Sequence, residues 1–202
     1  MLQRSLIALV AIMAAQMQML TLSAAEHGGE STIAYRLVED KTMHFDELQK
    51  ASEHLEAVKK LGCEVAPAGH DGHNDVTYRC PKWKSLTVAT DELAHQWEEW
   101  FQAAGFETLH GHNEAPAQGA IAVHFMMPQS KHMHVNDPAQ VKEFTAIFTG
   151  LGCTVEQAQH SGHIDLTIKC PKWRNLVFDT HDEAHAVQKW LDQQGFKTQH
   201  NH

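Results

Sequence analysis

The chain has 202 residues, of which 43% are hydrophobic and 20% are charged, so it has enough apolar material for one or two folded domains and is not a disordered polar chain. Its formal net charge of -9 disfavours a nucleic-acid backbone or an anionic membrane as a partner. The exceptional feature is the 17 histidines, which point to metal ions or to pH-dependent contacts.

The first 25 residues have the pattern of an export signal. Arg4 precedes the almost uncharged apolar run 6–22, and small residues end at Ala25. Polar residues follow directly, without the charges of a stop-transfer segment, so we expect no transmembrane anchor in the mature chain. The sequence therefore predicts a signal peptide over 1–25, cleaved after Ala25, and a periplasmic or secreted protein.

An internal repeat organises the rest of the chain. Residues 43–112 superimpose on residues 133–202 without a gap, and about 27 of roughly 70 positions are identical. The period is too long for a solenoid unit, so each copy is expected to be a small domain with its own core. The predicted domains are 26–112 and 123–202, with a linker over 113–122.

Each repeat begins with a short extended segment and a helix. In the first repeat the segment is 33–35, and the helix has Asp46 as its cap, apolar residues at three-to-four spacing and Gly62 at its end. In the second repeat Asn136 and Gly152 take the same positions. The pattern is typical of an amphipathic helix with one buried face.

Two alternating strands follow this helix. They are residues 63–70 and 73–80, joined by Asp71-Gly72, a dipeptide suited to a two-residue hairpin turn, and Ser161-Gly162 replaces it in the second repeat. Residues 86–88 alternate again, after Cys-Pro-Lys-Trp, and form a candidate for a further short strand.

A second helix and a last strand complete each repeat. Thr90 caps the helix of the first repeat and Gly105 ends it, and residues 106–110 form the strand. In the second repeat Thr180 and Glu183 make a capping box. The order strand, helix, strand, strand, helix, strand predicts an α+β fold with two helices on one face of an antiparallel sheet, ferredoxin-like or a close variant.

The hairpin register separates two interpretations of the four cysteines. A two-residue turn places Cys63 opposite Cys80 and Cys153 opposite Cys170, as non-hydrogen-bonded pairs with Cα atoms about 4.5 Å apart, within disulfide range. A zinc site that also uses His70 and His73 is disfavoured, because seven strand residues separate a cysteine from its histidine by roughly 23 Å. Exported proteins with an even cysteine count are commonly disulfide-bonded.

The same alternation assigns side chains to the two faces of the hairpin. The cysteines share one side with apolar residues, which predicts that the helices cover it. The other side is polar and either faces solvent or packs against the same face of the other repeat. Its residues are Glu64, His70, His73, Asp75, Thr77 and Arg79, and in the second repeat Glu156, His160, His163, Asp165, Thr167 and Lys169.

Twelve of the histidines occupy matched positions in the two repeats, and two clusters of them are candidate metal sites. The first cluster is His70, His73 and Asp75, with His160, His163 and Asp165 in the second repeat. The second is His110 and His112, with His200 and His202, and a ferredoxin-like sheet would place His44 and His134 beside it. His95 and His185 are expected to be half-buried helix residues rather than ligands.

These observations favour an exported metal-binding protein, acting in buffering, sensing or delivery of zinc, copper or nickel. Methionines near the histidines, among them Met43 and Met133, keep copper(I) open. The alternative is a disulfide-bonded domain that binds a protein partner through pH-sensitive histidines. An enzyme is the weakest interpretation: the repeated His73, Asp75 and Thr77 only loosely suggest a phosphoesterase, and no nucleophile with an adjacent base is visible.

The cysteine register yields a direct prediction. Each repeat should carry its own disulfide, Cys63 to Cys80 and Cys153 to Cys170, each closing a loop of about 16 residues and contributing roughly 3 kcal/mol by the chain-entropy estimate. Peptide mapping of the exported protein under non-reducing conditions measures this. Cross-links between the repeats, or four free thiols, would contradict it.

Overall fold

The computed structural model describes residues 30–70, 73–160 and 162–200. They form two compact units, one of residues 30–31 and 35–108 and the other of residues 32–34 and 109–200. The predicted signal peptide and His202 lie outside the described residues. Among the described residues, no helix is long and apolar enough to cross a membrane.

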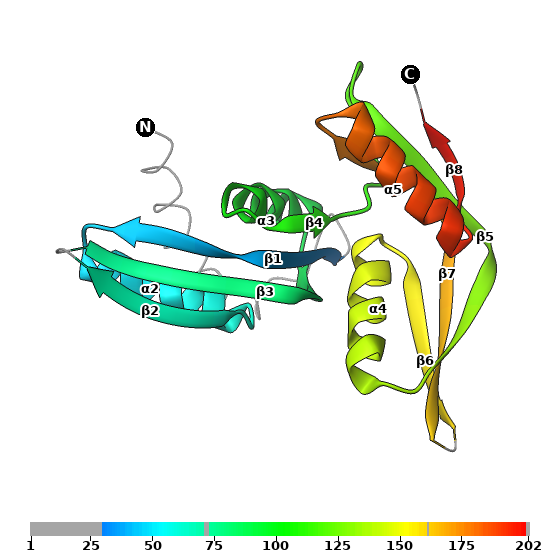
Figure 1. Ribbon diagram of the computed structural model, residues 1–202. Helices are drawn as coiled ribbons and strands as arrows, with labels where there is room; N and C mark the ends of the chain where they lie inside the picture. Colours follow the sequence, from blue (N-terminus) through cyan, green and yellow to red (C-terminus); the bar gives the residue numbers. More distant parts are fainter. Residues whose placement is uncertain (1–29, 71–72, 161, 201–202) are drawn as a thin grey trace. The chain divides into compact units, whose positions relative to one another are not determined.

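Each unit has the predicted α+β composition, a four-stranded antiparallel sheet with two helices (Figure 1). The first sheet has the order β2-β3-β1-β4 and the second the order β6-β7-β5-β8. The first set of elements is β1 (Ser31–Phe45), α2 (Leu48–Lys60), β2 (Glu64–His70), β3 (His73–Val88), α3 (Asp91–Ala103) and β4 (Glu107–Leu109). The second set is β5 (Ile121–Val135), α4 (Pro138–Gly150), β6 (Thr154–His160), β7 (His163–Phe178), α5 (His181–Gln194) and β8 (Lys197–His200).

The hairpin register is the one predicted from the turns. His70 pairs with His73 and Glu64 with Arg79, so the next pair outward is Cys63 and Cys80. In the second unit His160 pairs with His163, and the register continues to Thr154 and Lys169. Strand β2, which contains Pro67, is an edge strand, where a residue without an N–H donor is tolerated.

The strands are longer than the sequence suggested. Residues 73–80 and 86–88 belong to one strand, β3, and the segment expected at 33–35 is part of the 15-residue β1. In the second sheet the pairing of β5 with β7 shifts on either side of Met127, next to Pro128 and Pro171. Bulges of this kind let a strand pass a proline and continue.

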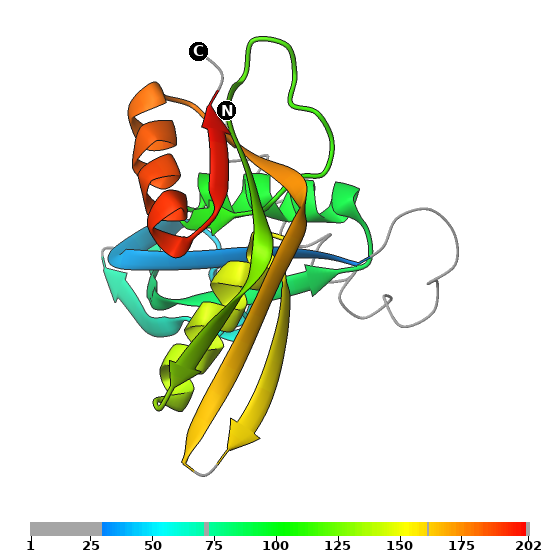
Figure 2. The same cartoon turned by 90° about the vertical axis from the view of Figure 1, so that its right-hand side faces the viewer.

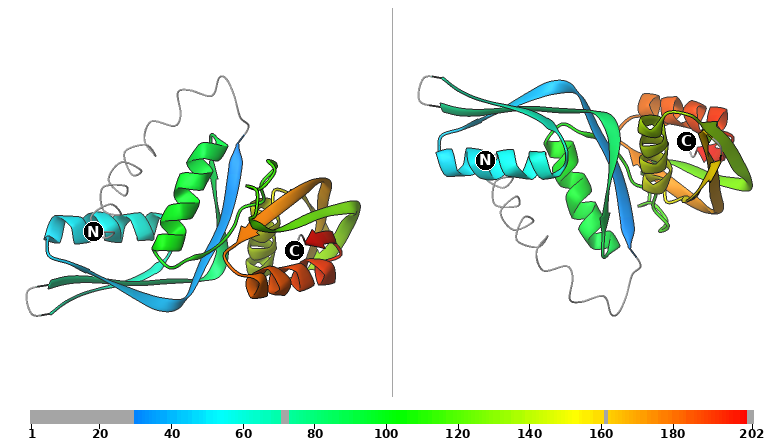
Figure 3. Two further views of the ribbon diagram at one scale, coloured as in Figure 1. Left: turned by 90° about the horizontal axis from the view of Figure 1, so that it is seen from above. Right: turned by 90° about the horizontal axis from the view of Figure 1, so that it is seen from below.

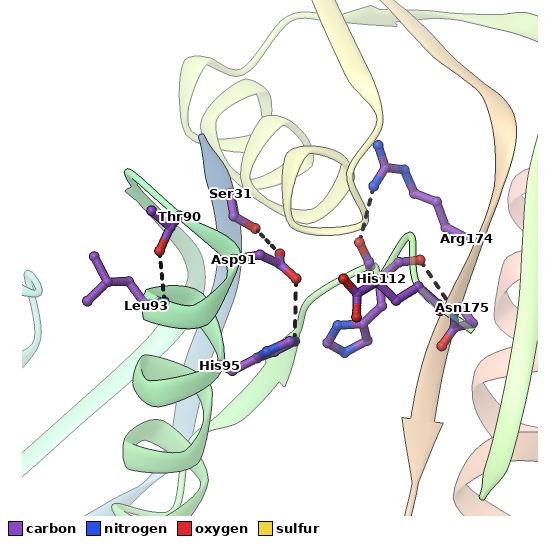
Figure 4. Close-up of polar contacts among 10 residues, drawn as sticks. Ser31, Thr90, Asp91, Leu93, His95, His112, Arg174 and Asn175 are labelled. Carbon is purple, nitrogen blue, oxygen red and sulfur yellow. Dashed lines mark hydrogen bonds and ion pairs between the residues drawn. The ribbon is translucent and has the colours of Figure 1, made fainter. Parts of the chain in front are cut away.

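Two of the four predicted helix caps are correct. Thr90 accepts a hydrogen bond from Leu93 N (Figure 4), and Thr180 accepts one from Glu183 N, at 3.3 Å each. Asp46 and Asn136 are not the caps. Helix α2 starts after Glu47, which makes no side-chain capping bond, and α4 starts after Asp137, whose carboxylate accepts from Ala139 N. In both cases the helix begins one residue later than the sequence suggested.

The two faces of each hairpin differ as predicted. Val76, Tyr78 and Cys80 are at most 2% exposed, and α2 and α3 lie on one side of the first sheet (Figure 3). In the second sheet Leu166 and Ile168 are fully buried, and Figure 2 shows α4 behind β5, β6 and β7. The alternate residues of β3 and β7 therefore form a face that the unit's own helices do not cover.

One histidine lies inside the core of the first unit. His54 on α2 is 4% exposed, among the rings of Phe45, Tyr78 and Trp100 at centroid distances of 5.3, 5.1 and 6.3 Å. Its Nε2 atom has no hydrogen-bond partner among the described residues. Burial lowers the pKa of His54 to about 4, because the apolar surroundings disfavour the imidazolium.

This histidine should make the first unit sensitive to acid. Between pH 6.5 and pH 4 the unfolded chain binds a proton at His54 that the folded chain does not. The contribution of His54 to the free energy of unfolding is therefore fully present above pH 6.5, and about 2 kcal/mol of it is lost by pH 5. His54→Phe copies Phe144, its counterpart in the second repeat, and should remove that part of the pH dependence. Urea titrations at pH 7.5 and pH 5 measure the free energy of unfolding of both proteins. An equal loss of stability between the two pH values in the wild type and in the variant would contradict the prediction.

Candidate metal site

Three side chains of the second unit converge at the end of the sheet near the hairpin. His134 is near the end of β5, directly opposite Asp165 of β7, and His163 is the first residue of β7. Each offers a ligand atom, and these atoms all lie within 4.8 Å of one another. The Oδ1 atom of Asp165 is hydrogen-bonded to His134 Nδ1 and lies 3.6 Å from His163 Nε2.

A third imidazole approaches the same carboxylate from the edge strand. His160 ends β6 and pairs with His163 across the turn, with ring centroids 5.9 Å apart. Its Nε2 atom lies 3.3 Å from the Oδ2 atom of Asp165. The side chain of Asp165 is 26% exposed and those of the three histidines are more exposed, so solvent reaches the whole cluster.

The donor set suits zinc, copper(II) or nickel, which prefer neutral imidazole together with carboxylate oxygen. Tetrahedral ligand atoms about 2 Å from zinc lie about 3.3 Å from one another. The ligand atoms of this cluster, which lie within 4.8 Å, must therefore approach one another by up to about 1.5 Å to bind the ion. Exposed side chains can make that movement by rotation about χ1 and χ2. His134 and His163 therefore supply two nitrogen ligands and Asp165 an oxygen ligand within reach of a single ion, and His160 adjoins the second oxygen of the same carboxylate.

The first unit repeats the central pair of this cluster. His44 Nδ1 lies 2.7 Å from Asp75 Oδ1, and these two residues are the counterparts of His134 and Asp165. His70 and His73 are backbone partners at the end of the same hairpin. Asp75 is only 7% exposed, against 60% for the His44 side chain. The first unit thus has a buried carboxylate that holds an exposed imidazole.

This carboxylate contact determines which nitrogen of the ring faces outward. An imidazole that donates from Nδ1 to a carboxylate has its lone pair on Nε2, and carboxylate–histidine–metal arrangements of this kind orient many metal ligands. In both units the carboxylate engages the Nδ1 atom, of His44 and of His134. Asp75 and Asp165 can therefore act by orienting a histidine ligand, apart from any direct bond to a metal.

The expected position of His44 and His134 beside the last strand is wrong. Strand β8 pairs with Val123–Met126 of β5, whereas His134 pairs with Asp165 much further along β5. The same holds for His44, which contacts Asp75. The central strand is long enough to have different neighbours at its two ends, so His44 and His134 belong to the hairpin cluster.

The terminal histidines do not form one matched cluster. His110 is buried, and its ring lies 4.5 Å from that of His112, both within the second unit. The backbone of His112 is bonded to Asn175 of β7 in both directions, and Figure 4 shows the contacts of Asn175 and Arg174 with this segment. His200 lies instead 4.8 Å from the ring of His185.

The helix histidines are more exposed than predicted. His95 has a side chain that is 45% exposed and lies 3.6 Å from Asp91 (Figure 4), and His185 is also exposed. Their positions beside the apolar residues of the helix suggested burial. In the structure both rings lie at the boundary of that apolar surface and reach solvent.

Two histidines without a counterpart in the other repeat lie near these clusters and were not predicted as ligands. His132 lies two residues before His134 on β5 and is 3.1 Å from Thr167 Oγ1. Strand alternation alone places it on the same face as His134. His181 begins α5 and lies four residues before His185, a spacing that places both on one side of a helix.

The cysteines lie on the opposite side of the sheet from this cluster. All four are buried free thiols in the structure, and the two of each hairpin are hydrogen-bonded neighbours. The hydrogen bond to Cys80 and burial raise the pKa of Cys63, and the same causes raise that of Cys153 beside Cys170. The two disulfides stay a prediction, and the cysteines lie on the face away from the histidines.

No protein-family model matches the chain, and no curated protein is significantly similar to it.

The contact between His44 and Asp75 predicts the tautomer of that imidazole. At a pH where the ring is neutral, His44 should carry its proton on Nδ1, because Asp75 accepts it. Long-range proton–nitrogen NMR spectra distinguish the two tautomers. Asp75→Ala should convert His44 to the Nε2–H form that a free imidazole prefers, and an unchanged spectrum would contradict the orienting role of Asp75.

Proposed function

We propose that this is an exported, periplasmic or secreted protein that binds zinc, copper or nickel ions and acts in their buffering, sensing or delivery. The observation that carries the proposal is the cluster of the second unit, in which three imidazoles surround the Asp165 carboxylate. The first unit supports it with the matching pair of His44 and Asp75. A carboxylate with two or more imidazoles is a donor set typical of these ions.

The surroundings of the cluster favour zinc, copper(II) or nickel over copper(I). Met133 precedes His134, but it packs against the buried Val135, Val141 and Leu166. Met127 is 3% exposed. Thioether ligands are what copper(I) prefers, and these two methionines belong to the core instead. The net charge of -9 raises the local concentration of any cation.

We further infer that each unit is a ferredoxin-like domain or a close variant of it. Support comes from the strand, helix, strand, strand, helix, strand order and from the pairing of the first strand with both the third and the fourth. In such an arrangement one sheet face remains without helices, and this face carries the histidines and carboxylates. The fold by itself would permit many other functions.

The competing hypothesis is a domain that binds another protein through pH-sensitive histidines. Protonation of the same three imidazoles would then change the affinity for a partner. Metal binding distinguishes the two hypotheses, because only the first requires the protein to bind an ion at saturable sites. A protein that binds none of the three metals with better than about micromolar affinity would support the second hypothesis.

The metal site predicts a pH-dependent thermal stabilisation. Zinc at about 100 times its dissociation constant should stabilise the folded protein by about 2.7 kcal/mol, which raises the Tm by several degrees at pH 7.5. The rise should be much smaller at pH 5.5, because most imidazoles with a pKa near 6.5 are then protonated and cannot bind metal. Differential scanning calorimetry with and without zinc measures both.

A pair of matched variants assigns the effect to this cluster. Asp165→Asn removes the central carboxylate and should reduce the zinc-induced rise in Tm. Glu156→Gln removes another carboxylate from the same strand pair, one that is bonded to Lys169 instead of a histidine, and should leave the rise unchanged. Replacing His70, His73, His160 and His163 with alanine should abolish the part of the effect that comes from the hairpin ends. Equal effects of the two carboxylate variants would contradict the assignment.

A further inference from the structure

We propose a second metal site in the second unit, formed by His181, His185 and His200, which takes one divalent ion of the zinc, copper(II) or nickel class. His181 and His185 lie on the first turns of α5, and His200 is on β8. The site is separate from the cluster around Asp165, so the proposal does not depend on that cluster binding metal.

The two elements bring the three rings together for simple geometric reasons. A spacing of four residues places His181 and His185 on the same side of α5. Strand β8 pairs with β5 through His200 and Val123. Strand alternation places Val123 on the same face as Phe125, whose ring contacts Phe196, the residue that also contacts Phe148 of α4, so this register position is on the helix side. The ring of His200 consequently lies 4.8 Å from that of His185 and 5.4 Å from that of His181.

These spacings suit a shared ion. A zinc ion about 2 Å from an imidazole nitrogen lies about 3 Å from the ring centre, so two rings on a tetrahedral ion have centres about 5 Å apart. The pairs that include His200 are at 4.8 and 5.4 Å, and His181 and His185 are 6.4 Å apart. Because His181 and His185 are exposed, a small rotation of either ring closes the last distance.

Comparison with the first repeat shows what changed at this position. The counterpart of His181 is Asp91, whose carboxylate lies 3.6 Å from His95, the counterpart of His185 (Figure 4). In the second repeat an imidazole thus stands where the first repeat has the carboxylate of an ion pair. Two imidazoles four residues apart on one helix can bind the same cation.

The environment of the triad favours a cation. The first turn of α5 carries Asp182 and Glu183 beside His181. These carboxylates offset the positive end of the helix dipole, which would otherwise disfavour a metal ion there. His134 is eleven residues from Val123 along β5, roughly 36 Å of strand, so the two clusters cannot share one ion.

The experiment is a histidine footprint of the full mature chain with zinc as the probe. Diethyl pyrocarbonate modifies unliganded imidazoles, and mass spectrometry identifies each modified residue. At about 100 times the dissociation constant only about 1% of the site is empty, so modification of His181 and His185 should slow by about 100-fold. The protection must persist in Asp165→Asn, which disrupts only the other cluster.

Variants and their outcomes separate the two proposals. The double variant His181→Ala with His185→Ala should lose one equivalent of zinc in equilibrium dialysis, and both side chains are exposed, so the fold should survive, as circular dichroism can verify. His124→Gln, a histidine on the opposite face from His200, should lose none. Protection of His134 and His163 without protection of His181 and His185 overturns the second site alone. The reverse pattern supports it and overturns the assignment around Asp165.

Discussion

The antiparallel register of the two hairpins is the constraint on which the rest of the structure depends. A two-residue turn fixes which residues are opposite each other, and strand alternation then sends each side chain to one face or the other. Cys170 and Ile168 therefore reach the helices, while His163 and Asp165 reach the polar face. A shift of one residue would bury the charged cluster and expose the core, so the core itself holds the histidines in position.

Local sequence signals were sufficient for the parts of the fold that depend on neighbouring residues. The pairing of His160 with His163, the caps Thr90 and Thr180 and the buried face of each hairpin follow from a few adjacent positions, and the structure agrees with them. The location of His134 did not follow in the same way. It depends on how far along β5 each neighbour pairs, which is decided by contacts between residues distant in the chain.

In the second sheet, prolines lie where the long strands change register. Pro128 and Pro171 lie where the pairing of β5 with β7 changes register. Each strand has an irregularity there, and beyond them the strands return to the original register at Lys131 and Ile168. A sequence pattern shows a proline as an interruption, because the missing N–H cannot donate to the ladder. Only the three-dimensional structure shows that the partner strand has a compensating irregularity. The resulting long strand is what carries His134 to the hairpin end.

The two repeats have diverged in a way that bears on their chemistry. His54 in the first core is replaced by Phe144, while Thr42 and Asp91 are replaced by the surface residues His132 and His181. The second unit therefore lacks the buried imidazole of the first unit and has two further imidazoles that solvent can reach. Both repeats have the pair of a histidine and an aspartate, as His44 with Asp75 and His134 with Asp165, and the additional surface histidines of the second unit lie near other histidines. This distribution is expected if metal affinity, and not packing, maintains histidine at the surface, because an exposed imidazole contributes little to folding but directly to binding.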